Sequence, residues 1–142
     1  MNSINFDVLP FLEGNTHIIV CPDLGTVDQG NTLESALANL LQTTQIFLQK
    51  SNRANIIPNL VVEDKILTSP SPSLPQVSAH KVIAVLERLG FRRTSQCVVL
   101  KKQSHIGEII CVVPLRNLLA SSTTWNILYS AGITLEEFLE NL

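Results

Sequence analysis

A run of prolines and serines near the middle of the chain limits the folds that are open to it. The segment TSPSPSLPQ, residues 68–76 of 142, contains three prolines. Proline lacks a backbone N–H and fixes φ, so this spacing excludes a helix and favours extended, polyproline-like backbone. The segment predicts a linker between two small domains, residues 1–67 and 77–142.

The first half carries the signals of three strands and one helix. Apolar residues alternate with polar ones over 4–8, and β-rich runs bounded by turn residues follow at THIIVC (16–21) and TVDQ (26–29). Asn31 or Thr32 can cap a helix whose apolar residues recur every three or four positions as far as Phe47. The order β-β-β-α predicts a small antiparallel sheet covered by a helix, with Val61 and Val62 in an edge strand.

The second half begins with a helix instead of a strand. Ser78 is the expected N-cap, and the apolar stripe ends before Gly90. CVVLKK (97–102) and EIICVV (108–113) predict two strands joined by the hairpin loop QSHIG. Helices are expected over 123–131 and after the Thr134 capping box. The whole chain is therefore predicted to be α+β, with an α-β-β-(β)-α second domain.

Composition and charge narrow the class of protein. Hydrophobic residues make up 45% of the chain, no window offers 18 consecutive apolar residues, and the N-terminus lacks the pattern of a secretory signal. The three cysteines show no CxxC spacing, and Asp23, Asp28 and Glu34 share no metal-ligand spacing. We therefore expect a cytoplasmic protein with no membrane partner, no cofactor and no metal.

The two halves differ in charge. Residues 1–73 hold three basic and seven acidic groups, whereas residues 74–142 hold seven basic and five acidic groups. The excess of basic groups is concentrated around Arg92, Arg93, Lys101 and Lys102. Such a cluster is suited either to phosphate groups of RNA or to docking on the acidic half. No aromatic residue is interleaved with it, which argues against base stacking.

Segments in the two halves of the chain resemble two families that act as partners. CPDLGTVDQGNTLESALANL (21–40) resembles the N-terminal domain of HicB antitoxins. LPQVSAHKVIAVLERLGFRR (74–93), EIICVVPLRN and STTWNILYSAGITLEEFL resemble the first helix, the last strand and the C-terminal helices of HicA toxins. The resemblance covers nearly the whole chain apart from the proline–serine segment. It implies a small sheet with one helix, followed by a domain like those that bind double-stranded RNA.

The resemblance also implies an activity that this sequence departs from. HicA toxins are mRNA endonucleases that depend on a histidine in a Gly-Ser-His type motif, and HicB covers that site. Counted without gaps, the histidine position falls near Leu100, and the motif's glycines fall near Val98 and Val99. Arg116 stands where the family often has a second histidine, and joins the candidate RNA contacts. A HicA-like half also replaces the DNA-binding tail that is usual in HicB, so no DNA-binding domain is apparent.

The chain's three histidines are weak replacements for the missing catalytic group. His105 lies in Gln103-Ser104-His105, which superficially resembles the family motif, but that register needs an insertion before it and a deletion after it. His17 and His80 are expected to be structural or surface residues. The candidate base is thus His105 or a group that the sequence does not reveal, and the position of Leu100 favours the loss of catalysis.

The sequence supports three functions. The first is a toxin–antitoxin-derived fusion whose HicA-like half is inactive and binds protein, either its own antitoxin-like half or a second copy, or RNA. The second is an mRNA endonuclease inhibited in cis by the HicB-like half. The third is a purely structural interaction module with no nucleic-acid partner.

Overall fold

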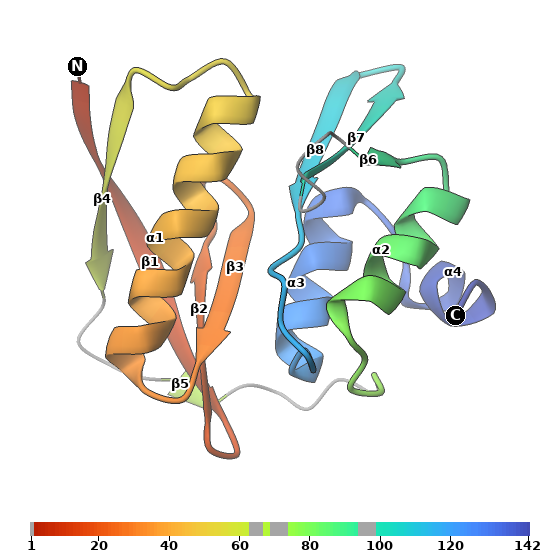
Figure 1. Ribbon diagram of the computed structural model, residues 1–142, viewed down its shortest axis with the longest axis horizontal. Coiled ribbons are helices and arrows are strands. Elements are labelled where there is room, and N and C mark those ends of the chain that lie inside the picture. Colours follow the sequence, from red (N-terminus) through yellow and green to blue (C-terminus); the bar gives the residue numbers. More distant parts are fainter. Residues whose placement is uncertain (1, 63–66, 69–73, 94–98) are drawn as a thin grey trace.

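A mixed sheet and one long helix form the first half of the molecule (Figure 1). The computed structural model describes residues 2–62, 67–68, 74–93 and 99–142. The elements are β1 (Asn2–Glu13), β2 (Thr16–Cys21), β3 (Thr26–Gly30), α1 (Leu33–Lys50), β4 (Ile56–Val62) and β5 (Leu67–Thr68). The strands lie in the order β3-β2-β1-β4, and β5 also pairs with β1.

The three predicted strands are antiparallel, but the whole sheet is mixed, because β4 and β5 are parallel to β1. β1, β2 and β3 are antiparallel neighbours, but β4 runs parallel to β1, with Asn2 opposite Ile56 and Val8 opposite Val62. The reason is the crossover through α1, which returns the chain to the end of the sheet where β1 begins. The alternation of residues does not encode strand direction. An edge strand could therefore be predicted at Val61 and Val62, but its direction could not.

Helix α1 begins and ends where its capping residues allow. The Thr32 side chain accepts the N–H of Ser35, and the Ser35 hydroxyl accepts the N–H of Thr32, which closes a capping box. The face that contains Ala36, Leu40 and Phe47 is buried. This confirms the predicted helix and places its C-terminal turn near the second half of the chain.

The second half is a three-stranded sheet with helices on one side. Its elements are α2 (Ala79–Arg88), β6 (Arg92–Arg93), β7 (Val99–Ser104), β8 (Gly107–Val112), α3 (Ser121–Ala131) and α4 (Leu135–Glu140), and the strand order is β6-β7-β8. The Ser78 N-cap and the Thr134–Glu137 capping box are confirmed. The hairpin is tighter than predicted, because Gln103, Ser104 and Gly107 belong to the strands. The predicted strand residues 97–98, with Cys97, lie outside the described residues.

The two halves share their apolar core. Because side chains alternate along a strand, β2 and β3 send one set of residues toward α1 and the other toward the second half. Ile18, Val20 and Val27 join the cluster that contains Ile127 and Leu128 of α3. The sheet of the first half is thus covered by α1 on one face and by the second half on part of the other (Figure 1).

The segment expected to be the linker is only partly described. Residues 69–73 lie outside the described part, Thr68 belongs to β5, and Leu74 is buried in the shared core. Within the described residues, no helix is both long and apolar enough to span a bilayer.

Candidate functional site

The position that the family resemblance assigns to catalysis is covered on both sides of the second sheet. Leu100 is 0% exposed and packs in the shared core with residues of α2 and α3. The neighbouring Val99 is also 0% exposed, but it contacts Phe47 and Leu48 of α1. Neighbouring strand residues point to opposite faces, so neither face of β7 is open to solvent at this point.

A partly buried ion pair joins the two halves beside this covered face. The Asp28 side chain on β3 is 0% exposed, and its two carboxylate oxygens accept from Nε and Nη2 of Arg116 at 3.2 and 3.1 Å. The Thr43 hydroxyl and the Gln29 N–H also donate to Asp28, each at 2.7 Å. The carboxylate is therefore fully hydrogen-bonded, as a buried charge requires.

Two further side chains of the first half bind backbone atoms of the second. The Gln29 amide donates to the Leu118 carbonyl at 3.1 Å and accepts the Ala120 N–H at 2.9 Å. The Glu13 carboxylate accepts the N–H groups of Ser121 and Ser122 at 3.0 and 3.2 Å. The segment between β8 and α3 is thus held by the first half mainly through its main chain.

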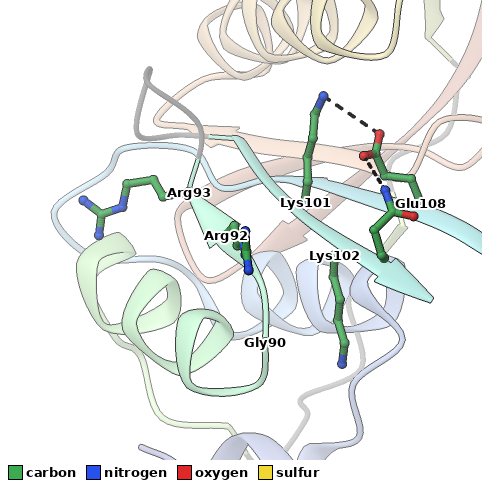
Figure 2. A pocket seen from close by; sticks show the side chains of 7 residues that line it. Gly90, Arg92, Arg93, Lys101, Lys102 and Glu108 are labelled. Atoms are coloured by element: carbon green, nitrogen blue, oxygen red, sulfur yellow. Dashed lines mark hydrogen bonds and ion pairs between the residues drawn. The ribbon is translucent and has the colours of Figure 1, made fainter.

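The four basic residues of the predicted cluster do not point the same way. Arg92 lies opposite Lys101 in the strand register, and Arg93 lies opposite the inward-facing Leu100. Figure 2 shows Lys101 and Lys102 leaving β7 in opposite directions, and Arg93 directed toward α2. Together with Gly90, Gln103 and Glu108, the four residues line an open hollow of about 570 Å³.

Most of these cations are already bound within the chain. Arg93 forms an ion pair with Glu87 at 3.0 Å, and the Lys102 ammonium donates to the Leu89 carbonyl at 3.0 Å. Lys101 donates to the Lys50 carbonyl at 3.0 Å, across the boundary between the halves. Among the described residues, Arg92 alone of the four has no hydrogen-bond or ion-pair partner. Of the four basic residues expected to dock on the first half, Lys101 does so, through its hydrogen bond to the Lys50 carbonyl. The ion pair between the halves in the described part of the chain is instead Asp28–Arg116.

The histidines lie apart from one another, and the two described cysteines are buried. His105 is exposed in the turn between β7 and β8, His80 is exposed in the first turn of α2, and His17 is partly buried with its Nδ1 lacking a partner among the described residues. Burial raises the pKa of the Cys111 thiol to about 12, and it also raises the pKa of Cys21, so both thiols stay protonated near neutral pH.

A metal site is not visible in the described part of the chain. There, no three side chains of His, Cys, Asp or Glu are grouped so that they could hold an ion. Asp28, which could have been a ligand, is used by Arg116 and Thr43.

The comparisons with known proteins give no family. No family model, curated protein or solved structure matches this chain. The HicA and HicB resemblance therefore stays a hypothesis that rests on the quoted segments.

Sequence reasoning missed Glu13, Gln29 and Asp28 as contacts between the halves. A signal was present at Asp28, because strand alternation places it on the same face of the sheet as Ile19, toward α1. A carboxylate on a buried face predicts a cationic partner. Its identity could not be inferred, because Arg116 lies 88 positions away.

Proposed function

We propose that this chain is a toxin–antitoxin-derived fusion whose HicA-like half does not cleave RNA and acts as a protein-binding domain. The observation that carries the proposal is the complete burial of Leu100 at the position that the resemblance assigns to the catalytic histidine. A general base must reach the 2′-hydroxyl of RNA and must exchange protons near neutral pH. A leucine in the core does neither.

The contacts between the halves support binding as the function that remains. An antitoxin-like domain inhibits by covering the toxin's working face, and here α1 covers Val99 and Val112 with Phe47 and Leu48. Polar contacts surround this apolar contact, with Asp28–Arg116 and the Gln29 amide fixing the relative position of the halves. The arrangement suits a permanent intramolecular complex more than a toxin awaiting release.

An RNA-cleavage assay on the whole chain tests the proposal. The chain and its Glu13→Arg variant are incubated with mixed-sequence RNA; the variant opposes a cation to the N-terminus of α3 and loosens the docking of the halves. We expect no cleavage by either protein. Circular dichroism shows whether the variant is folded, and its spectrum should match that of the unsubstituted chain.

The endonuclease held in cis is the second candidate, and the exposure of His105 favours it. His105 is solvent-accessible and Arg92, on the same sheet, has no partner among the described residues, so a base and a phosphate-binding cation are both available. Cleavage that appears in Glu13→Arg and disappears after a further His105→Ala substitution would establish this candidate and refute the inactive-fusion proposal.

A purely structural module predicts no affinity for RNA. An inactive fusion could instead bind RNA through its basic residues without cleaving it. Filter binding at low salt separates the structural module from such an RNA-binding fusion, because phosphate contacts weaken steeply as salt rises. Arg92→Ala is the informative variant, with Arg53→Ala, an exposed arginine of the first half, as control. Binding lost only in Arg92→Ala supports the RNA-binding form, and no binding by the intact chain supports the structural module.

A further inference from the structure

Strand β4 leaves one edge of the first sheet without a neighbour. The strand order ends at β4, and no strand in the described part of the chain pairs with its outer side. The Asn2 N–H donates to the Asn55 carbonyl at 3.1 Å while Asn2 lies opposite Ile56. In a parallel pair, this register directs the backbone N–H and C=O groups of Ile57, Asn59 and Val61 toward β1. The backbone groups of the residues between and beside them, at positions 56, 58, 60 and 62, therefore face outward.

This edge has only one of the features that normally prevent strands from associating, a proline at position 58. Proteins protect open edges with charged side chains, prolines, bulges or covering loops. β4 has the sequence IIPNLVV, without any charged residue, and Ile57 and Val61 are 46% and 45% exposed. Pro58 removes one outward donor, and the Ile56 N–H is already donated to the Arg53 carbonyl at 3.1 Å, so the N–H groups of Leu60 and Val62 remain.

A hollow beside the edge extends the same surface. It has a volume of about 360 Å³ and lies between Leu37 and Leu41 of α1 and Pro58 and Leu60 of β4. Helix α1 therefore has apolar side chains beside the open edge, where an added strand would cover them. Strand addition next to an apolar groove is a recurring mode of protein recognition.

We propose that β4 pairs antiparallel with β4 of a second copy of this chain, with Asn59 on the two-fold axis. This register places Ile57 opposite Val61 of the second copy and Val61 opposite its Ile57. Pro58 lies opposite Leu60 of the second copy, where its carbonyl can accept the Leu60 N–H although it has no N–H to donate in return. Opposed β-branched residues stabilise a pair of strands, and β4 carries no charge that would oppose a like charge along the paired strands, although Glu34 of α1 lines the hollow beside them. The two first-half sheets become continuous, and the hollows beside α1 face each other.

The register explains why a second copy is favoured over an unrelated strand. A two-fold contact requires a surface that is complementary to a second copy of itself. On the outer edge of β4 this condition is met when the two-fold axis passes through Asn59. Asn59 is exposed, and its amide already donates to Asn5 at 3.2 Å, so its replacement disturbs no core packing. Residue 59 is therefore the position at which the interface can be tested without unfolding the chain.

Introduction of a charge at Asn59 is the first test, measured by sedimentation equilibrium across a range of protein concentrations. The unsubstituted chain should dimerise with a dissociation constant in roughly the micromolar range. Asn59→Lys and Asn59→Glu each place like charges opposite one another, and each should weaken the dimer by roughly tenfold or more. An equimolar mixture of the two variants should restore it. Asn5→Lys is the matched control, one strand away from the edge, and should stay dimeric.

A cysteine at the same position gives a second, independent test. Opposed residues of this kind have Cα atoms about 4.5 Å apart, which is within disulfide range. Asn59→Cys should form a disulfide-linked dimer under mild oxidation, and Asn5→Cys should not. A monomeric unsubstituted chain, a dimer that survives Asn59→Lys, or a folded variant mixture that stays monomeric would each overturn the proposal.

Discussion

Asp28 illustrates how much of the docking depends on single side chains. Its carboxylate is completely buried, and Arg116 supplies two of its hydrogen bonds while remaining 34% exposed. Removing the arginine leaves an uncompensated charge in the interior, and this loss is more costly than the pair is stabilising.

We expect Arg116→Ala to lower the free energy of unfolding by about 2–4 kcal/mol, because the Asp28 charge loses its cation. Urea denaturation measures the change. The control is Arg92→Ala, which removes an exposed arginine without a described partner and should change stability by less than about 0.5 kcal/mol. Adding Asp28→Asn to Arg116→Ala should recover part of the loss, and no recovery would show that the pair is not coupled.

We expect Leu100→Ala to lower stability by about 2–5 kcal/mol, because it opens a cavity in the shared core. Leu115→Ala, at a leucine that is 49% exposed, is the control and should have a small effect. Thermal unfolding of both variants gives the comparison. An unchanged melting temperature for Leu100→Ala would show that the position faces solvent, as an active site must.

The burial of Leu100 could be predicted because it depends on local sequence. A leucine in a CVVL run is favoured in a strand core whatever the rest of the chain does. The roles of Asp28 and Arg116 could not be predicted, since they follow from contacts between residues far apart in the sequence. Periodicity gives the face on which a residue lies and leaves its partner undetermined.

At the scale of elements, helix α3 depends on a cap from elsewhere in the chain. Its N-cap residue is Ala120, which has no side-chain hydrogen bond to offer, and Glu13 of β1 accepts the first N–H groups instead. A carboxylate at this end also complements the helix dipole. The formation of α3 is therefore linked to the docking of the first half.

We expect Glu13→Ala to lower stability by about 0.5–2 kcal/mol, the range for removal of an N-cap. Amide hydrogen exchange should quicken in the first turn of α3, while exchange within α1 stays unchanged. Asp7→Ala is the matched control, an exposed carboxylate on the same strand. Equal exchange in the first turn of α3 for both variants would contradict the capping role.

The elements themselves were largely predictable, and so was the antiparallel direction of β1, β2 and β3, but the direction of β4 was not. The capping residues Thr32, Ser78 and Thr134 mark helix starts that local hydrogen bonds determine. The parallel direction of β4 depends on the length and packing of the α1 crossover, which are properties of the assembled sheet. The early start of α3 at Ser121 has the same origin, because its cap is Glu13 and not a neighbouring side chain.

At the scale of the whole molecule, the apolar contacts dominate the docking. The core cluster contains residues of both halves, whereas exposed ion pairs contribute only about 0–1 kcal/mol each. A protease site placed within 69–73 would therefore cut the chain without separating it.

We expect the cut halves to co-elute in size-exclusion chromatography at low salt and, with modest weakening, at about 1 M salt, where exposed charges are screened. Cutting also removes the high effective concentration that a linker provides, so slow dissociation on dilution should appear. A variant with the same protease site left uncut is the control. Separation of the halves at low salt would show that the shared core does not hold them together.

The contacts of Gln29 and Glu13 affect how many amino acids the segment between β8 and α3 can accept. Gln29 binds the carbonyl of Leu118, a main-chain atom that is the same whatever side chain position 118 carries. Ala120 and Ser122 are buried, and the Ser122 hydroxyl also donates to Glu13, so the freedom to vary lies at the exposed positions 117 and 118. A library of substitutions should therefore find the exposed side chains at Asn117 and Leu118 replaceable by most amino acids other than proline, while Arg116 tolerates few. The chain could acquire a new surface at this loop, and with it a new binding preference, without loosening the contact between its halves.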